Sequence, residues 1–127
     1  MSMEEKRKYP RLSLKMEDGY FGNFKLKDQE KLVAPIMNIS AGGLNMAVSE
    51  QAASRLAEGD ELVLQKIVGG TSFSFLSDIT AEIRWIRALQ SPGYLFVGCR
   101  FRGITENVRD QLASFVHTER MARGQYD

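Results

Sequence analysis

The sequence predicts a mainly β protein, a β-barrel or sandwich that is followed by a C-terminal α-helix. Several short segments alternate apolar and polar residues, which is the pattern of half-buried strands, and turns containing glycine or proline separate them. After residue 105 the spacing of the apolar residues changes from that of a strand to that of a helix. The 127 residues, of which 43% are hydrophobic and 26% charged, suit one globular domain with a single core.

The N-terminal segment divides into an arm and a first strand. Residues 1–8 are expected to form a flexible arm because charged side chains dominate and almost nothing apolar holds them in place. Residues 9–127 are expected to form the single domain. Apolar and polar residues alternate over residues 12–16, which predicts a strand, and Pro10 excludes a helix from the segment that leads into it.

The middle of the chain is a succession of predicted strands and turns. Strands are expected at residues 21–27, 32–37, 44–48, 61–68 and 72–76. Pro35 indicates that the second of these lies at a sheet edge or beside a bulge. The polar and glycine-containing residues 38–43 predict a turn, and residues 50–57 predict a short helix. Gly69 and Gly70 predict a tight hairpin turn.

Two further strands are predicted at residues 79–86 and 95–101. In the first, the alternation places Trp85 on the same face as Ile83, which favours a core position for Trp85 over a role as an exposed stacking platform. The opposite face carries Arg84, and the next strand presents Arg100 in the same way. Cys99 has apolar neighbours two residues away on either side, so it is expected to be a buried, unreactive thiol.

The closing helix is predicted to begin at Thr105, whose hydroxyl can cap the first turn, and to end near Gly124. Its apolar residues share one side, so the helix is expected to close the barrel or to pack on a partner. They are Val108, Leu112, Phe115 and Val116.

Two polar motifs stand out from this framework. Arg7 and Arg11 lie four residues apart on extended chain, about 13 Å from each other at ~3.3 Å per residue. Guanidinium groups can stack on a purine, bind the O6 and N7 edge of guanine, or hold phosphate oxygens. The later run Asn38-Ile39-Ser40-Ala41-Gly42-Gly43 supplies an amide, a hydroxyl and backbone that a ligand can approach closely.

The order R-x-x-x-R followed by N-x-S-x-x-G resembles the PilZ family, bacterial receptors for the second messenger cyclic di-GMP. The resemblance covers roughly residues 4–122 and includes the segments 79–86 and 94–101 and the closing helix. It implies a six-stranded antiparallel β-barrel of the split-barrel type with a C-terminal α-helix. The ligand would lie on the outside of this barrel, between the N-terminal arm and the 38–43 turn.

The resemblance also implies a set of cyclic di-GMP-binding residues. Lys6, Arg84 and Arg100 are possible additional contacts. Asn38 stands where the family often has an aspartate, and its neutral amide is a weaker acceptor for the edge of guanine. The principal contacts are expected from Arg7, Arg11, Asn38, Ser40, Gly42 and Gly43.

Composition and missing motifs restrict the function. A formal net charge of +1 argues against a DNA- or RNA-binding surface, and no apolar run is long enough to cross a membrane. The polar start does not resemble a secretory signal, so a cytoplasmic protein is expected. His117 is the single histidine, and neither metal-ligand spacing nor a catalytic motif accompanies it, so we expect no enzyme, metal or cofactor.

We therefore expect a cyclic di-GMP receptor, a monomer or weak homodimer, that orders its N-terminal arm on binding and signals to a partner protein. One alternative is a PilZ-like adaptor that has lost nucleotide binding and acts only through protein contacts. Another is a small barrel that binds single-stranded nucleic acid, although such proteins usually carry aromatic residues along a basic groove.

Overall fold

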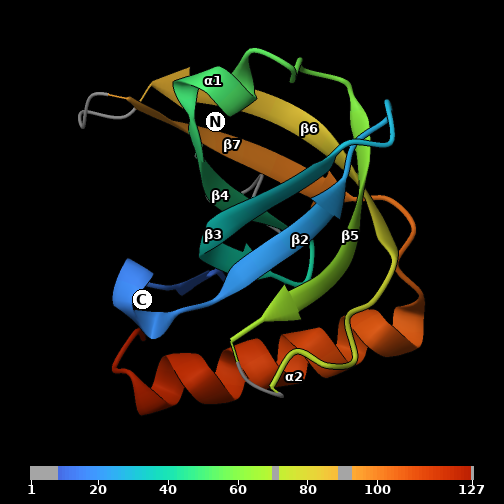
Figure 1. The fold of residues 1–127 in the computed structure, drawn as a ribbon. Helices are drawn as coiled ribbons and strands as arrows, with labels where there is room; N and C mark the ends of the chain where they lie inside the picture. The colour runs from blue at the N-terminus through green and yellow to red at the C-terminus, as the bar shows by residue number, and fades with distance from the viewer. Residues whose placement is uncertain (1–8, 70–71, 89–92, 127) are drawn as a thin grey trace, which may run out of the picture.

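The computed structural model describes residues 9–69, 72–88 and 93–126, so the predicted arm at residues 1–8, with Lys6 and Arg7, lies outside the described residues. Strands and helices follow one another along the chain in Figure 1. The elements are β1 (Leu12–Ser13), the 3-10 helix η2 (Met16–Asp18), β2 (Phe21–Lys25), β3 (Lys31–Ser40), β4 (Gly43–Ser49), α1 (Glu50–Ala53), β5 (Glu61–Val68), β6 (Ile79–Ala88), β7 (Tyr94–Phe101) and α2 (Glu106–Ala122).

Six of the strands close into an antiparallel barrel. The order of neighbours is β3, β2, β5, β6, β7 and β4, and pairing between β3 and β4 completes the circle. The short strand β1 adds to the free edge of β3, with Leu12 opposite Ile39 and Ser13 opposite Asn38. The predicted six-stranded antiparallel barrel with a C-terminal α-helix is therefore confirmed.

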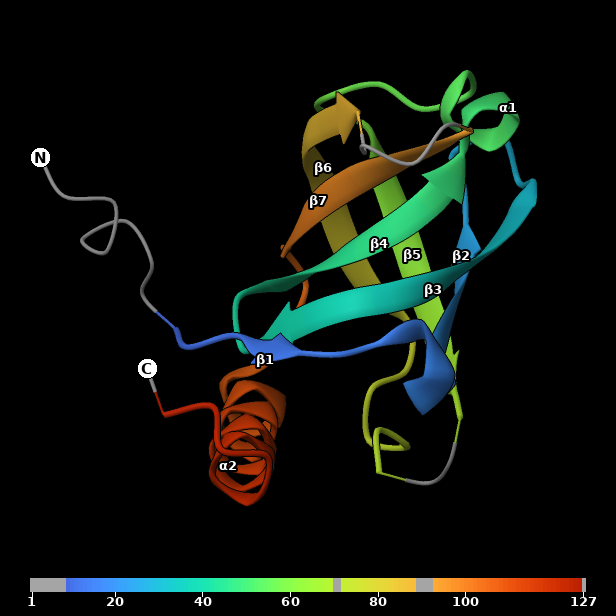
Figure 2. The ribbon, with the colours of Figure 1, turned by 90° about the vertical axis from the view of Figure 1, so that its left-hand side faces the viewer.

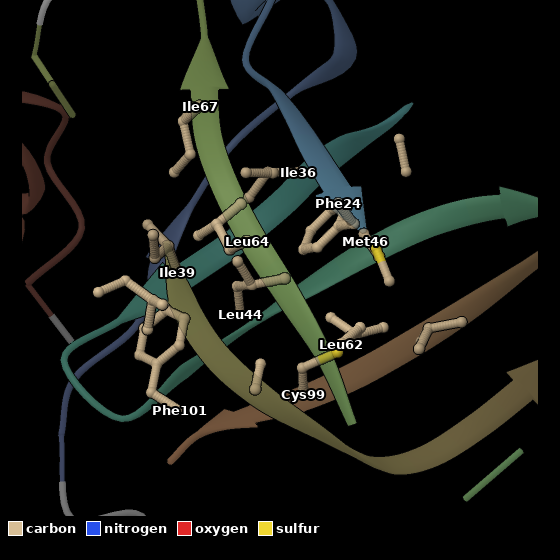
Figure 3. Packing of buried hydrophobic residues seen from close by; sticks show 14 of the residues in the cluster. Phe24, Ile36, Ile39, Leu44, Met46, Leu62, Leu64, Ile67, Cys99 and Phe101 are labelled. Atoms are coloured by element: carbon tan, nitrogen blue, oxygen red, sulfur yellow. The ribbon is translucent and has the colours of Figure 1, made fainter. Parts of the chain in front are cut away.

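The interior of the barrel is filled by the inward side chains of every strand (Figure 3). Phe24, Leu44 and Leu64 have no exposed surface, and Ile36 and Cys99 are almost as well buried. A fully buried side chain of this kind contributes about 1.5–3 kcal/mol. Burial alternates along β2, β3 and β5, so every second side chain of these strands points into the core.

Helix α2 lies across one end of the barrel (Figures 1 and 2). The Thr105 hydroxyl accepts a hydrogen bond from the Val108 N–H at 3.2 Å, which caps the first turn as predicted. Leu112 and Val116 are buried against the barrel, and the helix contacts β1 and β3. Of the two roles predicted for this helix, closing the barrel or packing on a partner, the structure shows the first. None of the helices among the described residues is long and apolar enough to cross a membrane.

The strand predicted at residues 72–76 is wrong. This segment forms turns, and pairing between β5 and β6 begins only at Leu64 and Ile79. Phe73 is buried and meets the rings of Tyr20 and Phe115 edge-on, with centroids 5.2 and 4.8 Å away. The segment therefore fills the space between the end of the barrel and α2. Its apolar residues are stabilised more by packing there than by pairing with another strand.

Several boundaries also differ from the predictions. The first strand ends at Ser13, and Met16 lies in the 3-10 helix with 53% of its surface exposed. The turn predicted at residues 38–43 is shorter, because β3 continues to Ser40 and β4 begins at Gly43. The first helix covers only Glu50–Ala53, and β2 ends at Lys25. Gly70 of the predicted hairpin turn is outside the described residues.

Candidate ligand-binding site

A cavity of about 390 Å³ opens on the outer surface of the barrel. It is bordered by the segment that leads into β1 and by β3, β4, β7 and β6, and β3, β4 and β7 succeed one another across the view of Figure 2. The cavity is lined by Tyr9, Arg11, Ser40, Gly42, Asn45, Arg84, Trp85, Gly98, Cys99 and Arg100.

The register of the strands explains why these residues meet. Asn38 on β3 lies opposite Asn45 on β4, which lies opposite Gly98 on β7, which in turn lies opposite Trp85 on β6. Residues that face each other across paired strands point to the same side of the sheet. This row therefore crosses four strands on the outer face.

A second row lies beside it on the same face. Ser40 pairs with Gly43, Gly43 with Arg100, and Arg100 with Glu82. Gly98 and Gly43 lie at the centre of the two rows, and their Cβ positions are taken by the Trp85 ring and by the Cys99 backbone, so neither glycine adds a side chain between the amides on β3 and β4 and the arginines on β6 and β7.

Trp85 faces this cavity rather than the core, so its predicted core position is wrong. The pairing of β6 with β7 shifts by one residue between Ile83 and Trp85, and this bulge reverses the alternation. The Trp85 ring lies over Gly98, where any added Cβ would overlap it, and the Arg87 guanidinium lies 4.4 Å from the ring centroid. Trp85 is half-buried.

Arg11 and Asn38 bring the two polar motifs into contact. Arg11 Nη1 donates a hydrogen bond to Asn38 Oδ1 at 2.9 Å, across a separation of 27 residues in the sequence. Both side chains are partly buried. The acceptor atom of Asn38 is thus held beside the guanidinium of Arg11, which lines the cavity, whereas Asn38 itself is not among the lining residues.

Ser40 and Gly42 form a tight turn at one wall. Ser40 is 3% exposed, and its hydroxyl accepts a hydrogen bond from the Gly42 N–H at 3.1 Å. A Cβ at Gly42 would lie 3.0 Å from the Tyr9 ring, so the absent side chain makes room for that aromatic. At Gly43 a Cβ would overlap the Cys99 carbonyl oxygen, so β4 and β7 can approach only because this residue is glycine.

The opposite wall carries a cluster of arginines around one carboxylate. Glu82 Oε1 accepts from Arg102 Nη1 at 2.7 Å and from Arg100 Nη2 at 3.4 Å, and Arg84 Nη1 lies 3.7 Å away. The hydrogen bond from Arg102 and the positive charges of all three arginines lower the pKa of the Glu82 carboxyl. Arg84 and Arg100 face outward, as predicted, and both line the cavity.

Comparison with protein-family models finds a match to the PilZ domain over residues 5–118, which is most of the chain. The chain belongs to the PilZ domain family. Comparison with curated protein sequences finds no match.

Solved structures share the fold of this PilZ domain. The PilZ domain with c-di-GMP of YcgR from Escherichia coli is 23% identical, with a TM-score of 0.74 and coverage of 94% of this chain and 95% of that one. The MrkH-c-di-GMP complex from K. pneumonia is 16% identical, with a TM-score of 0.73 and coverage of 95% and 55%. MotI from Bacillus subtilis is 15% identical, with a TM-score of 0.68 and coverage of 92% and 52%. The chain thus spans nearly all of the YcgR domain but about half of MrkH and MotI.

Sequence reasoning missed five residues of the PilZ domain's cavity: Trp85 and Cys99, which it assigned to the core, and Tyr9, Asn45 and Gly98. Asn45 had a usable signal, because it is polar within the apolar segment 44–48. Gly98 had another, because glycine inside a strand often marks close approach by another group. Tyr9 directly precedes Pro10 and had no signal that separates it from other aromatic residues.

The described residues offer little for chemistry that makes or breaks bonds. Cys99 belongs to the cavity floor, but its thiol is buried in the core, and this burial raises the pKa to about 12, so the thiolate nucleophile is scarce at neutral pH. Within residues 9–69, 72–88 and 93–126, no three His, Cys, Asp or Glu side chains gather as metal ligands would. Arg11, Arg84 and Arg100 supply the cavity with cationic hydrogen-bond donors.

Proposed function

We propose that this PilZ domain is a receptor for cyclic di-GMP, which it binds on the outer face of the barrel. The observation that carries the proposal is the convergence of motif residues and arginines on one cavity. Arg11, Ser40 and Gly42 line one side of it, and Arg84 and Arg100 line the other. Cationic walls around a hollow with an aromatic ring suit a dianionic ligand with two purine bases.

Each motif residue has a role in this proposal. Arg7 and Arg11 hold phosphate and guanine, Asn38 accepts from a guanine edge, and Ser40 contacts a phosphate or a base. The backbone at Gly42 and Gly43 comes close to the ligand, and Lys6, Arg84 and Arg100 provide further positive charge. Because Asn38 is neutral, its contact is weaker than a carboxylate would make.

The solved relatives support the choice of ligand. The structures of the E. coli YcgR domain, of K. pneumonia MrkH and of Borreliella burgdorferi PlzA contain c-di-GMP. The proposal for this chain rests on the cavity and on family membership, because each of these structures is less than 25% identical to it.

The proposed output is an order-disorder switch without catalysis. Ligand that bridges Arg7 in the arm at residues 1–8 and the barrel wall orders that arm and creates or hides a surface for a partner protein. A partner and a cytoplasmic location belong to this proposal. Amide hydrogen exchange measured with and without cyclic di-GMP tests the switch, and equal protection of the arm in both states contradicts it.

Calorimetric titration of cyclic di-GMP tests the binding itself. The wild type should bind, and the Arg7→Ala, Arg11→Ala double variant should lose about tenfold to over a hundredfold in affinity for each charged contact removed, at on the order of 1.5–3 kcal/mol per contact. Arg55→Ala is the control, because Arg55 pairs with Glu30 away from the cavity. No binding by the wild type at high micromolar ligand would refute the proposal.

The same titration separates the alternative functions. An adaptor that has lost nucleotide binding would give no heat with cyclic di-GMP while still folding normally. A single-stranded nucleic acid binder would retain oligonucleotides in a filter-binding assay at low salt. We expect heat in the first experiment and no retention in the second.

A further inference from the structure

The arginine cluster on β6, on β7 and directly after β7 contains more positive charge than its carboxylate can neutralise. Arg84, Arg100 and Arg102 all lie within 4 Å of a single oxygen, Glu82 Oε1. One carboxylate faces three guanidinium groups, so the cluster keeps a net positive charge. A second anion near it would be attracted electrostatically.

Two of these three arginines also belong to the cavity. Arg84 and Arg100 line it, whereas Arg102, which makes the shortest contact with Glu82, is absent from the lining. The carboxylate therefore lies between the cavity arginines and the arginine that anchors it. An anion in the cavity would compete with Glu82 for the hydrogen-bond donors of Arg84 and Arg100.

We infer that Glu82 is a built-in competitor of the ligand: its carboxylate occupies the donors of Arg84 and Arg100 that phosphate or guanine oxygens of the bound ligand use. This inference rests on the proposed function and adds a residue outside the family motif. Glu82 acts through the arginines, so it is a positioning residue. Its competition sets the affinity and reserves these arginines for a ligand that is anionic enough to displace it.

The contacts are weak enough for this exchange. The side chains of Arg84 and Arg100 are about half exposed, at 49% and 52%, so solvent screens their attraction to Glu82. Their distances of 3.7 and 3.4 Å are longer than the 2.7 Å contact of Arg102. A ligand can thus recruit the two cavity arginines while Arg102 continues to hold the carboxylate in place.

The test is Glu82→Gln, which removes the charge and keeps the shape. Calorimetric titration should show that the variant binds cyclic di-GMP roughly two- to fivefold more tightly than the wild type, the range expected for one exposed ion pair. The gain should shrink as salt is added, because freed arginines make binding more sensitive to ionic strength. In an Arg84→Ala, Arg100→Ala background the same change should have no effect.

The matched control is Glu61→Gln. Glu61 lies directly opposite Glu82 on β5, is exposed, and is outside the cavity lining. If Glu61→Gln tightens binding as much as Glu82→Gln, the effect is general electrostatics and the inference fails. Glu82→Asp, which withdraws the carboxylate but keeps its charge, should fall between the wild type and Glu82→Gln.

The outcomes distinguish this inference from the proposed function. Unchanged or weaker binding by Glu82→Gln, with normal binding by the wild type, overturns the inference and leaves the receptor intact. Absence of binding by both proteins overturns the receptor, and the inference with it. Thermal unfolding of each variant checks that the barrel is retained.

Discussion

Two faces of the same barrel are built from the same strand pattern, yet only one of them holds the candidate site. The cavity face consists of β4, β6, β7 and the end of β3, where Gly43 pairs with Arg100 and Gly98 with Trp85. The other face consists of β2, β5 and the start of β3, where none of the cavity's lining residues lies. Its outward side chains include Phe21, Val33 and Val68, which are 37%, 61% and 46% exposed.

A bulge alone does not explain this difference, because register shifts occur on both faces, including one between Ile36 and Asn38 where β3 meets β4. The register shifts between Asn23 and Phe24 where β2 meets β5, and between Ile83 and Trp85 where β6 meets β7. On the first face, side chains cover the strands around the bulge. On the second, the bulge turns a tryptophan outward over a glycine. The cavity face therefore differs in the outward Trp85 ring packed over Gly98 and in the close approach of β4 to β7 at Gly43.

The largest effect on stability is expected from Gly43→Ala, which adds a methyl group where the backbones of β4 and β7 come close together on the cavity face. The new Cβ would overlap the Cys99 carbonyl oxygen, and backbone on both sides cannot rotate away as a flexible side chain could. We expect a loss of about 3 kcal/mol or more in the free energy of unfolding, measured by urea denaturation.

Gly103→Ala is the control for this prediction. A Cβ there would lie 3.3 Å from the Thr80 Cβ, so only a small adjustment is needed, and the loss should stay below about 1 kcal/mol. Equal stability of Gly43→Ala and the wild type would show that the two strands need not approach so closely.

The second prediction concerns Gly98→Ala, which tests whether the tryptophan shapes the cavity. The added methyl must displace the Trp85 ring, at a cost of about 1–3 kcal/mol in stability. Because Trp85 is the only tryptophan in the sequence, the intrinsic tryptophan fluorescence of the protein should report the displacement of its ring directly. We also expect about tenfold weaker binding of cyclic di-GMP, which corresponds to about 1.4 kcal/mol.

Asn23→Ala gives the matching change on the other face. Asn23 lies beside the register shift between β2 and β5 and pairs with Lys66, away from the cavity. The affinity of the Asn23→Ala variant for cyclic di-GMP should equal that of the wild type. If Gly98→Ala also keeps full affinity, the tryptophan and glycine pair has no part in the site.

Much of the fold could be predicted because alternation reports burial directly. Strand β5 matches its predicted bounds, and the outward placement of Arg84 and Arg100 follows from the same pattern. The strand prediction for residues 72–76 failed because Phe73 and Phe75 alternate with polar residues as in a strand, whereas Phe73 packs into the end of the barrel. The local sequence pattern cannot distinguish a buried apolar turn from a short strand, since both bury alternate residues.

The site was harder to predict because it depends on register. One extra residue in β6 reverses the face of Trp85, and nothing in the sequence marks that shift. Asn45 becomes a cavity residue only because it lies between Asn38 and Gly98 in the pairing. The motif residues Arg11, Ser40 and Gly42 could be named in advance because a family resemblance, rather than periodicity, singled them out.

The third prediction uses Cys99, whose side chain faces the core beneath the cavity floor. Burial raises the pKa of its thiol from 9.0 to about 12. Below pH 9 the thiol is protonated in both the folded and the unfolded chain, so its titration takes nothing from the free energy of unfolding. Between pH 9 and 12 only the unfolded chain releases the proton, so stability should fall by up to about 1.4 kcal/mol per pH unit.

Urea denaturation from pH 8 to about 10.5 measures this dependence against Cys99→Ala, which lacks the thiol. Other groups titrate in both proteins, so the difference between the two curves isolates Cys99. The wild type should lose stability faster than the variant above pH 9. Parallel curves would mean that the thiol reaches solvent and that the floor between cavity and core is open.

The smallest expected effect compares one cation from each face. Arg100 lines the cavity, whereas Lys66 is an exposed cation on β5 outside it. Arg100→Ala should weaken cyclic di-GMP binding by about fivefold, or roughly 1 kcal/mol, because the guanidinium is half exposed and already shared with Glu82. Lys66→Ala removes the same charge and should change the affinity by less than about twofold, since a distant surface charge is screened. Equal losses in the two variants would mean that overall charge attracts the ligand, and the distinction between the two faces would then have no bearing on binding.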